Sequence, residues 1–289
     1  MESVLRNTRV TLEMIKWEHS IFALPFALTA TVLAAGGWPS LPKLCWIVWC
    51  MVMARSAAMG FNRWADAEID AKNPRTKMRA IPAGQLSRGF VLAFTLVAAG
   101  LFIAGAAMLN HLTLLLSPVA LLVVLAYSYM KRVTRWSHLV LGLALGIAPA
   151  AAWIAVRGSL DLRIVLLTAI VLLWVGGFDV LYACQDYEHD VRVGLNSIPA
   201  AFGLNGAFWI ARIMHLTMAV LLFVFLHLFG LGTIALGGMC AVVLLLVYEH
   251  AIISPSDLRR MNAAFFTLNG VISMVFFASI AVDLLMHRG

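Results

Sequence analysis

The sequence predicts an all-α, polytopic membrane protein with about nine transmembrane helices. Of its 289 residues, 62% are hydrophobic and only 12% are charged, whereas a soluble domain carries about 25% charged residues. Apolar runs recur along the whole chain, and most are near the roughly 20 residues that a helix needs to cross a bilayer. We therefore expect one membrane-embedded domain over residues 1–289 and no separate soluble domain.

The expected helices follow one another with short polar connections. Residues 8–19 can form an amphipathic helix at the membrane surface, and the apolar run that follows is short enough to be only partly inserted. Each later run is bounded by charged or turn-forming residues. The nine expected helices cover residues 20–36, 44–61, 87–108, 111–129, 137–156, 162–182, 204–229, 231–252 and 263–286.

The positive charges predict how the chain is oriented. With a cytoplasmic N-terminus, the inner segments hold 15 of the 21 Lys and Arg residues. Such an excess on one side is typical of cytoplasmic loops. The net charge of +7 is thus explained by topology, and no nucleic acid partner is expected.

Half of the acidic residues lie in two short segments. Of 14 Asp and Glu residues, seven fall within residues 62–70 (NRWADAEID) and 179–190 (DVLYACQDYEHD). We call these the first and second acidic segments. Acidic residues are costly in an apolar chain and mark functional sites. Both segments follow an expected helix at its cytoplasmic end.

The two segments resemble each other and suggest an internal repeat. Both contain DxExD, at residues 66–70 and 186–190, and both are followed by basic residues and an IPA tripeptide. We therefore expect two related four-helix units, at about 20–129 and 137–252, and a ninth helix at 263–286. Internal repeats with a binding site between the halves are common in membrane folds.

The spacing of polar residues predicts two facing stripes. Residues four apart share one helical face, so Asn62, Asp66 and Asp70 form one stripe. Asp179, Tyr182, Asp186 and Asp190 form the other. Hard oxygen ligands suit Mg²⁺, which usually takes one or two carboxylates together with waters and substrate phosphates. Glu68 and Glu188 lie off both stripes and are not expected to be ligands.

A cationic, turn-rich loop follows the first acidic segment (KNPRTKMRAIPAGQLSR). It places Lys72, Arg75 and Arg79 beside the expected metal site. Cationic side chains next to Mg²⁺ would neutralise a diphosphate leaving group. Membrane anchoring explains some of these charges equally well.

Four motifs in this order resemble the UbiA superfamily of intramembrane aromatic prenyltransferases. They are NxxxDxxxD at 62–70, NPRTxxRxIPAG at 73–84, YxxxK at 127–131 and DxExD at 186–190. Arg63 stands where the family often has a further aspartate. The runs IFALPFA at 21–27 and SIPAAFG at 197–203 are most similar to the 4-hydroxybenzoate polyprenyltransferase-like branch.

The resemblance implies an Mg²⁺-dependent reaction at the membrane. A polyprenyl diphosphate would bind to Mg²⁺ held by Asn62, Asp66, Asp70, Asp186 and Asp190, and Lys131 would contact the diphosphate. Tyr127 would face the allylic cation, and Asp179 would be an added ligand or the proton acceptor. The acceptor would be an aromatic acid, 4-hydroxybenzoate or, alternatively, 1,4-dihydroxy-6-naphthoate. The product would serve ubiquinone or menaquinone synthesis at the cytoplasmic side of a bacterial inner membrane.

Two other classes of membrane protein remain as alternatives. A transporter would place its acidic residues near the middle of the bilayer on broken helices, whereas these lie at helix ends beside basic loops. A phosphatidyltransferase of the CDP-alcohol type also uses aspartates and Mg²⁺, but no Asp-Gly dipeptide occurs in this chain.

Overall fold

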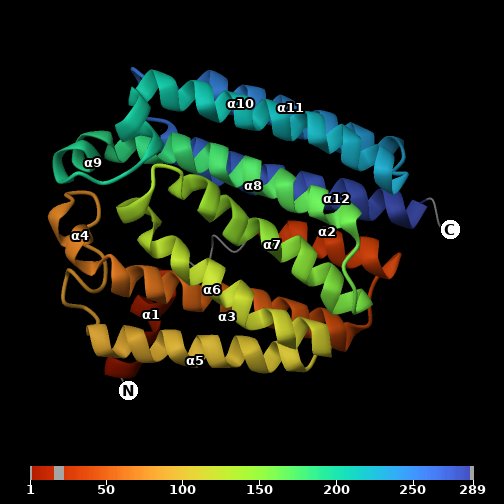
Figure 1. The fold of residues 1–289 in the computed structure, drawn as a ribbon, viewed down its shortest axis with the longest axis horizontal. Helices are drawn as coiled ribbons and strands as arrows, with labels where there is room; N and C mark the ends of the chain where they lie inside the picture. The colour runs from red at the N-terminus through yellow and green to blue at the C-terminus, as the bar shows by residue number, and fades with distance from the viewer. Residues whose placement is uncertain (1, 16–22, 287–289) are drawn as a thin grey trace.

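The chain forms an elongated bundle of α-helices (Figure 1). The computed structural model describes residues 2–15 and 23–286, and no strand occurs in these ranges. Eight helices are long and apolar enough to cross a membrane, and one shorter apolar helix precedes them. The nine predicted helices are thereby confirmed. They are α2 (Leu24–Ala35), α3 (Leu41–Ala65), α5 (Arg88–Ala107), α6 (His111–Val133), α7 (Ser137–Arg157), α8 (Leu162–Ala183), α10 (Ile198–Phe229), α11 (Thr233–Ile252) and α12 (Asn269–Met286) with the π-helical turn η3 (Ala263–Leu268) before it.

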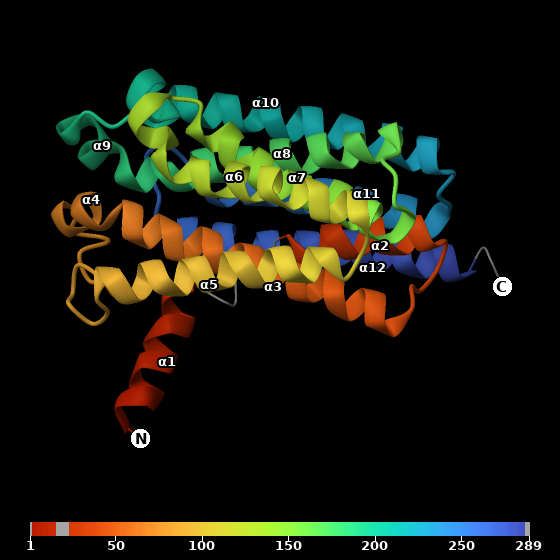
Figure 2. The ribbon, with the colours of Figure 1, turned by 60° about the horizontal axis from the view of Figure 1, so that its bottom comes forward.

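Among the described residues, three further α-helices and the 3-10 turn η2 (Cys184–Asp186) lie outside this set. Helix α1 (Glu2–Ile15) projects away from the bundle (Figure 2) and buries Met14 and Ile15 against the loop before α5 and α5 itself. The surface helix was expected at 8–19, and residues 16–19 of that range lie outside the described residues. Helices α4 (Ala67–Lys72) and α9 (Tyr187–Val193) are short and extend the ends of α3 and α8.

Proline and glycine set several helix boundaries. Pro118 and Pro149 lie inside α6 and α7. Pro25, which falls within the expected helix 20–36, stands in the first turn of α2, where its missing N–H is not needed. Gly203 interrupts α10 with φ 70°, a conformation that costs glycine little. The apolar run at 204–229 therefore begins just after this kink.

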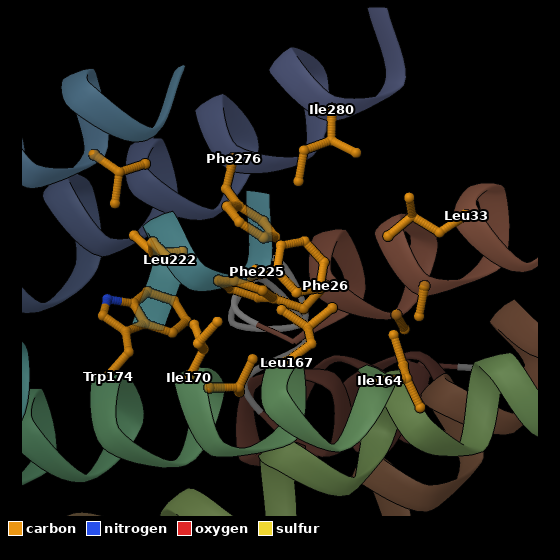
Figure 3. Packing of buried hydrophobic residues seen from close by; sticks show 14 of the residues in the cluster. Phe26, Leu33, Ile164, Leu167, Ile170, Trp174, Leu222, Phe225, Phe276 and Ile280 are labelled. Atoms are coloured by element: carbon orange, nitrogen blue, oxygen red, sulfur yellow. The ribbon is translucent and has the colours of Figure 1, made fainter. Parts of the chain in front are cut away.

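The core of the bundle surrounds α8, which packs most extensively on α7 and α10. Phe26 of α2 lies with its ring centroid 4.9 Å from both Trp174 of α8 and Phe276 of α12 (Figure 3). All three side chains are fully buried. Because lipid tails are as apolar as these side chains, close packing rather than the hydrophobic effect holds such helices together.

Small residues let α8 approach its neighbours closely. A Cβ atom at Gly142 of α7 would overlap the backbone of Leu172, and one at Gly177 of α8 would overlap the ring of His215 from α10. The Gly176-Gly177 pair thus permits a close approach between α8 and α10. This packing fixes the position of α8, whose far end carries the second acidic segment.

Candidate active site

The two acidic segments meet at one end of the bundle. Helices α4 and α9, which carry parts of these segments, lie side by side there (Figure 1). Between them is a cavity of about 160 Å³. Its lining includes Asn62, Asp66, Asp70, Asn73, Arg75, Thr76, Arg79, Tyr127, Lys131, Arg132, Asp179, Tyr182, Asp186 and Asp190.

The backbone turns in the same way at the first aspartate of each pair. Asp66 ends α3 with φ −93° and ψ 4°, and Asp186 precedes α9 with φ −99° and ψ 4°. This sparsely populated region of backbone conformation is frequent at active sites. In the first segment the amides of Asp66 and Asp70 still bond four residues back, so the predicted i, i+4 spacing survives the break.

Each of the four aspartates faces a basic side chain. Arg79 contacts both carboxylate oxygens of Asp70, at 2.7 and 2.8 Å, and Lys131 Nζ lies 3.3 Å from Asp190 Oδ2. Arg132 Nη2 donates to Asp66 Oδ1 at 3.1 Å. Arg75 donates two N–H groups to the Asp186 carboxylate, and its Nε lies 2.8 Å from Oδ1. The site is therefore built from matched opposite charges.

The loop between α4 and α5 ties the two acidic segments together. Asn73 donates from Nδ2 to Asp186 Oδ1 at 3.1 Å, and its own Oδ1 accepts the backbone N–H of Arg75. The Arg75 guanidinium also lies over the ring of Tyr182, 5.4 Å from its centroid. Loop residues that follow the first segment thus position the second.

Asn62 holds Asp66 in place. Its Nδ2 donates to Asp66 Oδ2 at 2.8 Å, while its Oδ1 accepts from Arg63 Nη1 at 3.3 Å. Burial raises the pKa of the Asp66 carboxyl, and the hydrogen bond from Arg132 opposes this shift. Because burial disfavours the charged carboxylate, added positive charge nearby would stabilise it.

Two further predicted residues lie in the same cavity, deeper in the bundle. Tyr127 is one turn before Lys131 on α6, and Asp179 is two turns before Asp186 on α8. Asp179 Oδ2 is 2.7 Å from Nδ1 of His138, whose side chain is fully buried. The cavity is thus lined by charged groups at the end of the bundle and by a tyrosine and an aspartate inside it.

The structure brings together every predicted site residue except one. Lys72, the last residue of α4, is exposed and does not line the cavity. Arg132 supplies the fourth cation instead. Sequence reasoning also missed Asn73 and His138. Arg132 could have been found because it follows Lys131 directly, and Asn73 because it begins the NPRT run. Nothing in the sequence singled out His138.

The donor set fits Mg²⁺ shared with a substrate. Within residues 2–15 and 23–286, no three His, Cys, Asp or Glu side chains converge closely enough to hold a metal alone. Two pairs of carboxylates face one cavity, and Mg²⁺ commonly takes one or two carboxylates and completes its shell with water and phosphate oxygens.

Comparison with known proteins agrees with this geometry. The model of the UbiA prenyltransferase family matches residues 23–278. The 4-hydroxybenzoate octaprenyltransferase of Vibrio cholerae serotype O1 is 33% identical, over 87% of this chain and 88% of the relative. The enzyme of the same name from Photobacterium profundum is 31% identical over 93% of both chains.

Solved structures share the fold. The apo structure of a UbiA homolog from Aeropyrum pernix K1 superposes with a TM-score of 0.84, at 33% identity, over 92% of this chain and 98% of that one. A UbiA homolog from Archaeoglobus fulgidus, bound to DMAPP and Mg²⁺, has a TM-score of 0.71 at 18% identity, over 95% and 99%. The predicted resemblance is confirmed, and the chain belongs to the UbiA prenyltransferase family.

Proposed function

We propose that this protein transfers a polyprenyl group from a polyprenyl diphosphate to 4-hydroxybenzoate, in ubiquinone synthesis. The observation that carries the proposal is a cavity in which four aspartates are each paired with a basic side chain. Such a site suits a diphosphate bound with divalent cations. The choice of acceptor is supported by relatives named 4-hydroxybenzoate octaprenyltransferase that match nearly the whole chain.

Asp66, Asp70, Asp186 and Asp190 are the residues that would hold Mg²⁺. When bound, Mg²⁺ would neutralise the diphosphate and make it a better leaving group. Asn62 is better placed to orient Asp66 than to bind a metal, because its amide oxygen already accepts a hydrogen bond from Arg63.

The basic side chains have two uses in this proposal. Without substrate, Arg75, Arg79, Lys131 and Arg132 neutralise the aspartates and hold them in position. With a diphosphate present, the same side chains can turn from carboxylate to phosphate oxygens, since Arg and Lys donate to both. Preorganised cations of this kind favour charge that develops on the departing group.

The inner part of the cavity suits the organic half of the reaction. The ring of Tyr127 offers a π face to an allylic cation, and the apolar helices exclude water that would quench it. The excess of positive charge at this end of the bundle supports its position at the cytoplasmic side of the membrane. The prenyl tail would extend among the apolar helices.

A reconstituted assay tests the proposal. Purified protein in lipid vesicles receives Mg²⁺, octaprenyl diphosphate and 4-hydroxybenzoate, and the prenylated acid is measured by mass spectrometry. We expect product that disappears when EDTA removes the Mg²⁺. A parallel reaction contains 1,4-dihydroxy-6-naphthoate. Product from the naphthoate alone would overturn the acceptor assignment, and no product from either by a folded protein would overturn the function.

A matched pair of variants tests the site assignment. Asp186→Ala removes a buried carboxylate that lines the cavity, whereas Glu188→Ala removes an exposed one two residues away. We expect the first variant to lose product formation and the second to keep it. Equal activity in both variants would contradict the proposed metal site.

A further inference from the structure

His138 forms a buried dyad with Asp179 inside the cavity wall. Its side chain is fully buried in the first turn of α7, and it contacts groups on both sides. Nδ1 lies 2.7 Å from Asp179 Oδ2, and Nε2 lies 3.4 Å from the backbone nitrogen of Ile198. We propose that His138 is a positioning residue that holds Asp179 as the base for the acceptor's ring proton. This inference rests on the proposed function.

The contacts of His138 determine which ring nitrogen carries its proton. The backbone N–H of Ile198 can only donate, so Nε2 must accept and therefore has no hydrogen of its own. The single proton of the neutral ring is then on Nδ1, which donates to the Asp179 carboxylate. A donor fixed in this way restricts the rotation of the carboxylate and orients its oxygens.

The position of Asp179 separates it from the carboxylates proposed to hold Mg²⁺. Asp179 is seven positions before Asp186, across the last turn of α8 and the 3-10 turn η2 (Cys184–Asp186), which corresponds to about 10 Å along the axis. Asp179 is thus deeper in the bundle, on the side where the organic substrates would meet. It lines the cavity together with Tyr127, and its side chain is 17% exposed.

The proposed step joins the aromatic ring to the prenyl group and removes one ring proton. A π-electron pair of the ring forms the new C–C bond to the allylic carbon, and the C–O bond breaks with its electron pair leaving on diphosphate. The ring carbon that was attacked still carries hydrogen. One Asp179 oxygen takes this hydrogen as a proton, and the C–H electron pair restores the aromatic ring.

His138 orients the base and does not itself take the proton. Its Nδ1 already carries hydrogen, and the lone pair of Nε2 is used by Ile198. The protonated Asp179 instead releases its proton to the cavity, to which part of its side chain is open. Replacing a histidine that orients its partner through a fixed tautomer would therefore slow proton removal and leave substrate binding unchanged.

Two substitutions of His138 test this role in the full-length protein. His138→Leu removes the donor, and His138→Asn keeps an N–H group near the position of Nδ1. Misplacing a reacting group by about 1 Å can cost ~10²-fold in rate, so we expect kcat of His138→Leu to fall by about that factor. KM for the prenyl diphosphate should stay the same, and His138→Asn should recover most of kcat.

A deuterium isotope effect separates positioning from a structural role. 4-Hydroxybenzoate is deuterated at the ring carbons beside the hydroxyl-bearing carbon. If proton removal becomes slow in His138→Leu, the ratio of rates for light and heavy acceptor should rise above the wild-type ratio. The control is His215→Leu, because His215 is also buried and hydrogen-bonded, to His250 and Trp174; its ratio should equal that of the wild type.

The outcomes decide the two proposals separately. Turnover by the wild type supports the function whatever the variants do. An unchanged isotope ratio in His138→Leu, or a His138→Asn variant as slow as His138→Leu, would overturn the positioning role while leaving the function standing. A wild-type protein that converts neither acceptor overturns both.

Discussion

The two acidic segments have the same backbone conformation at the first aspartate of their DxExD motifs but differ in how their aspartates are held. Asp66 and Asp186 adopt the same conformation, and each begins a short helix. The second pair is less exposed: side-chain exposure is 8% for Asp186 and 2% for Asp190, against 22% for Asp66 and 7% for Asp70. A sequence repeat can therefore preserve local geometry while the surroundings of its two copies diverge.

The loops after the two segments account for this difference. The loop after the first segment supplies Arg79 to Asp70 and Arg75 to Asp186. The loop after the second segment supplies neither. Its Asn196 instead bonds the carbonyl oxygens of Lys131 and Arg132, at the end of α6. One loop therefore provides cations directly, and the other anchors the helix end that provides the remaining two.

The largest expected effect tests whether both segments are required. Asp66→Ala and Asp186→Ala should each lower kcat/KM by about 10³-fold or more, since each removes a charge on which the bound diphosphate and its cations would depend. The measurement is product formation over a range of Mg²⁺ concentrations. Loss in only one of the two variants would mean that one segment is dispensable.

The next largest effects are expected for the basic side chains that pair with the first aspartate of each DxExD motif. Arg75 makes two hydrogen bonds to a buried carboxylate, whereas Arg132 makes one to a carboxylate that is more exposed. We expect Arg75→Ala to reduce kcat/KM by about 10²-fold and Arg132→Ala by about 10-fold. Steady-state kinetics with the prenyl diphosphate as the varied substrate measures both. A larger loss in Arg132→Ala than in Arg75→Ala would show that the burial of the carboxylate does not decide the effect of its cation.

A smaller effect is expected for the two loop asparagines. Asn73→Ala removes a direct hydrogen bond to Asp186 and should cost about 10-fold in kcat, as expected for a buried bond to a charged group. Asn196→Ala loosens α6 only indirectly and should cost about 1 kcal/mol of stability. Activity and thermal unfolding are measured for each. Equal loss of activity would show that both loops act on the site in the same way.

The smallest effect is expected at the two glutamates of the DxExD motifs. Glu68 pairs with Arg88 at the surface, and Glu188 is exposed. Glu68→Gln and Glu188→Gln should change activity by less than about twofold, because exposed substitutions usually stay within about 0.5 kcal/mol. A large loss in either variant would place a functional surface outside the cavity.

The helices were predictable because their cause is local. Long apolar stretches must satisfy their own backbone hydrogen bonds in a membrane, so residues 87–108 could be assigned to a helix that the structure places at Arg88–Ala107. Pro25 falls in the second turn of the helix expected at 20–36, but α2 begins at Leu24, so Pro25 stands in its first turn. The cytoplasmic orientation of the N-terminus and the two four-helix units stay predictions.

The pairing of charges was not predictable to the same extent. Asp66 and Asp70 were found from their spacing alone, because i, i+4 residues share a helical face. Arg75 was expected near a diphosphate, but its contact with Asp186 spans 111 residues and depends on how one loop crosses the bundle. For the same reason Lys72, which was expected at the site, does not line the cavity, and Arg132, which was not expected there, does.

The sequence by itself determined the helical membrane fold and the acidic residues of the cavity, since composition and short-range spacing encode them, and the resemblance of four motifs indicated the family. Only the tertiary structure decided which cation meets which carboxylate, that Asn62 orients Asp66, and that His138 bonds Asp179. The contacts of Arg75, Lys131, Arg132 and His138 join segments that are far apart along the chain. Their geometry follows from the packing of α6, α7 and α8, which no local pattern specifies.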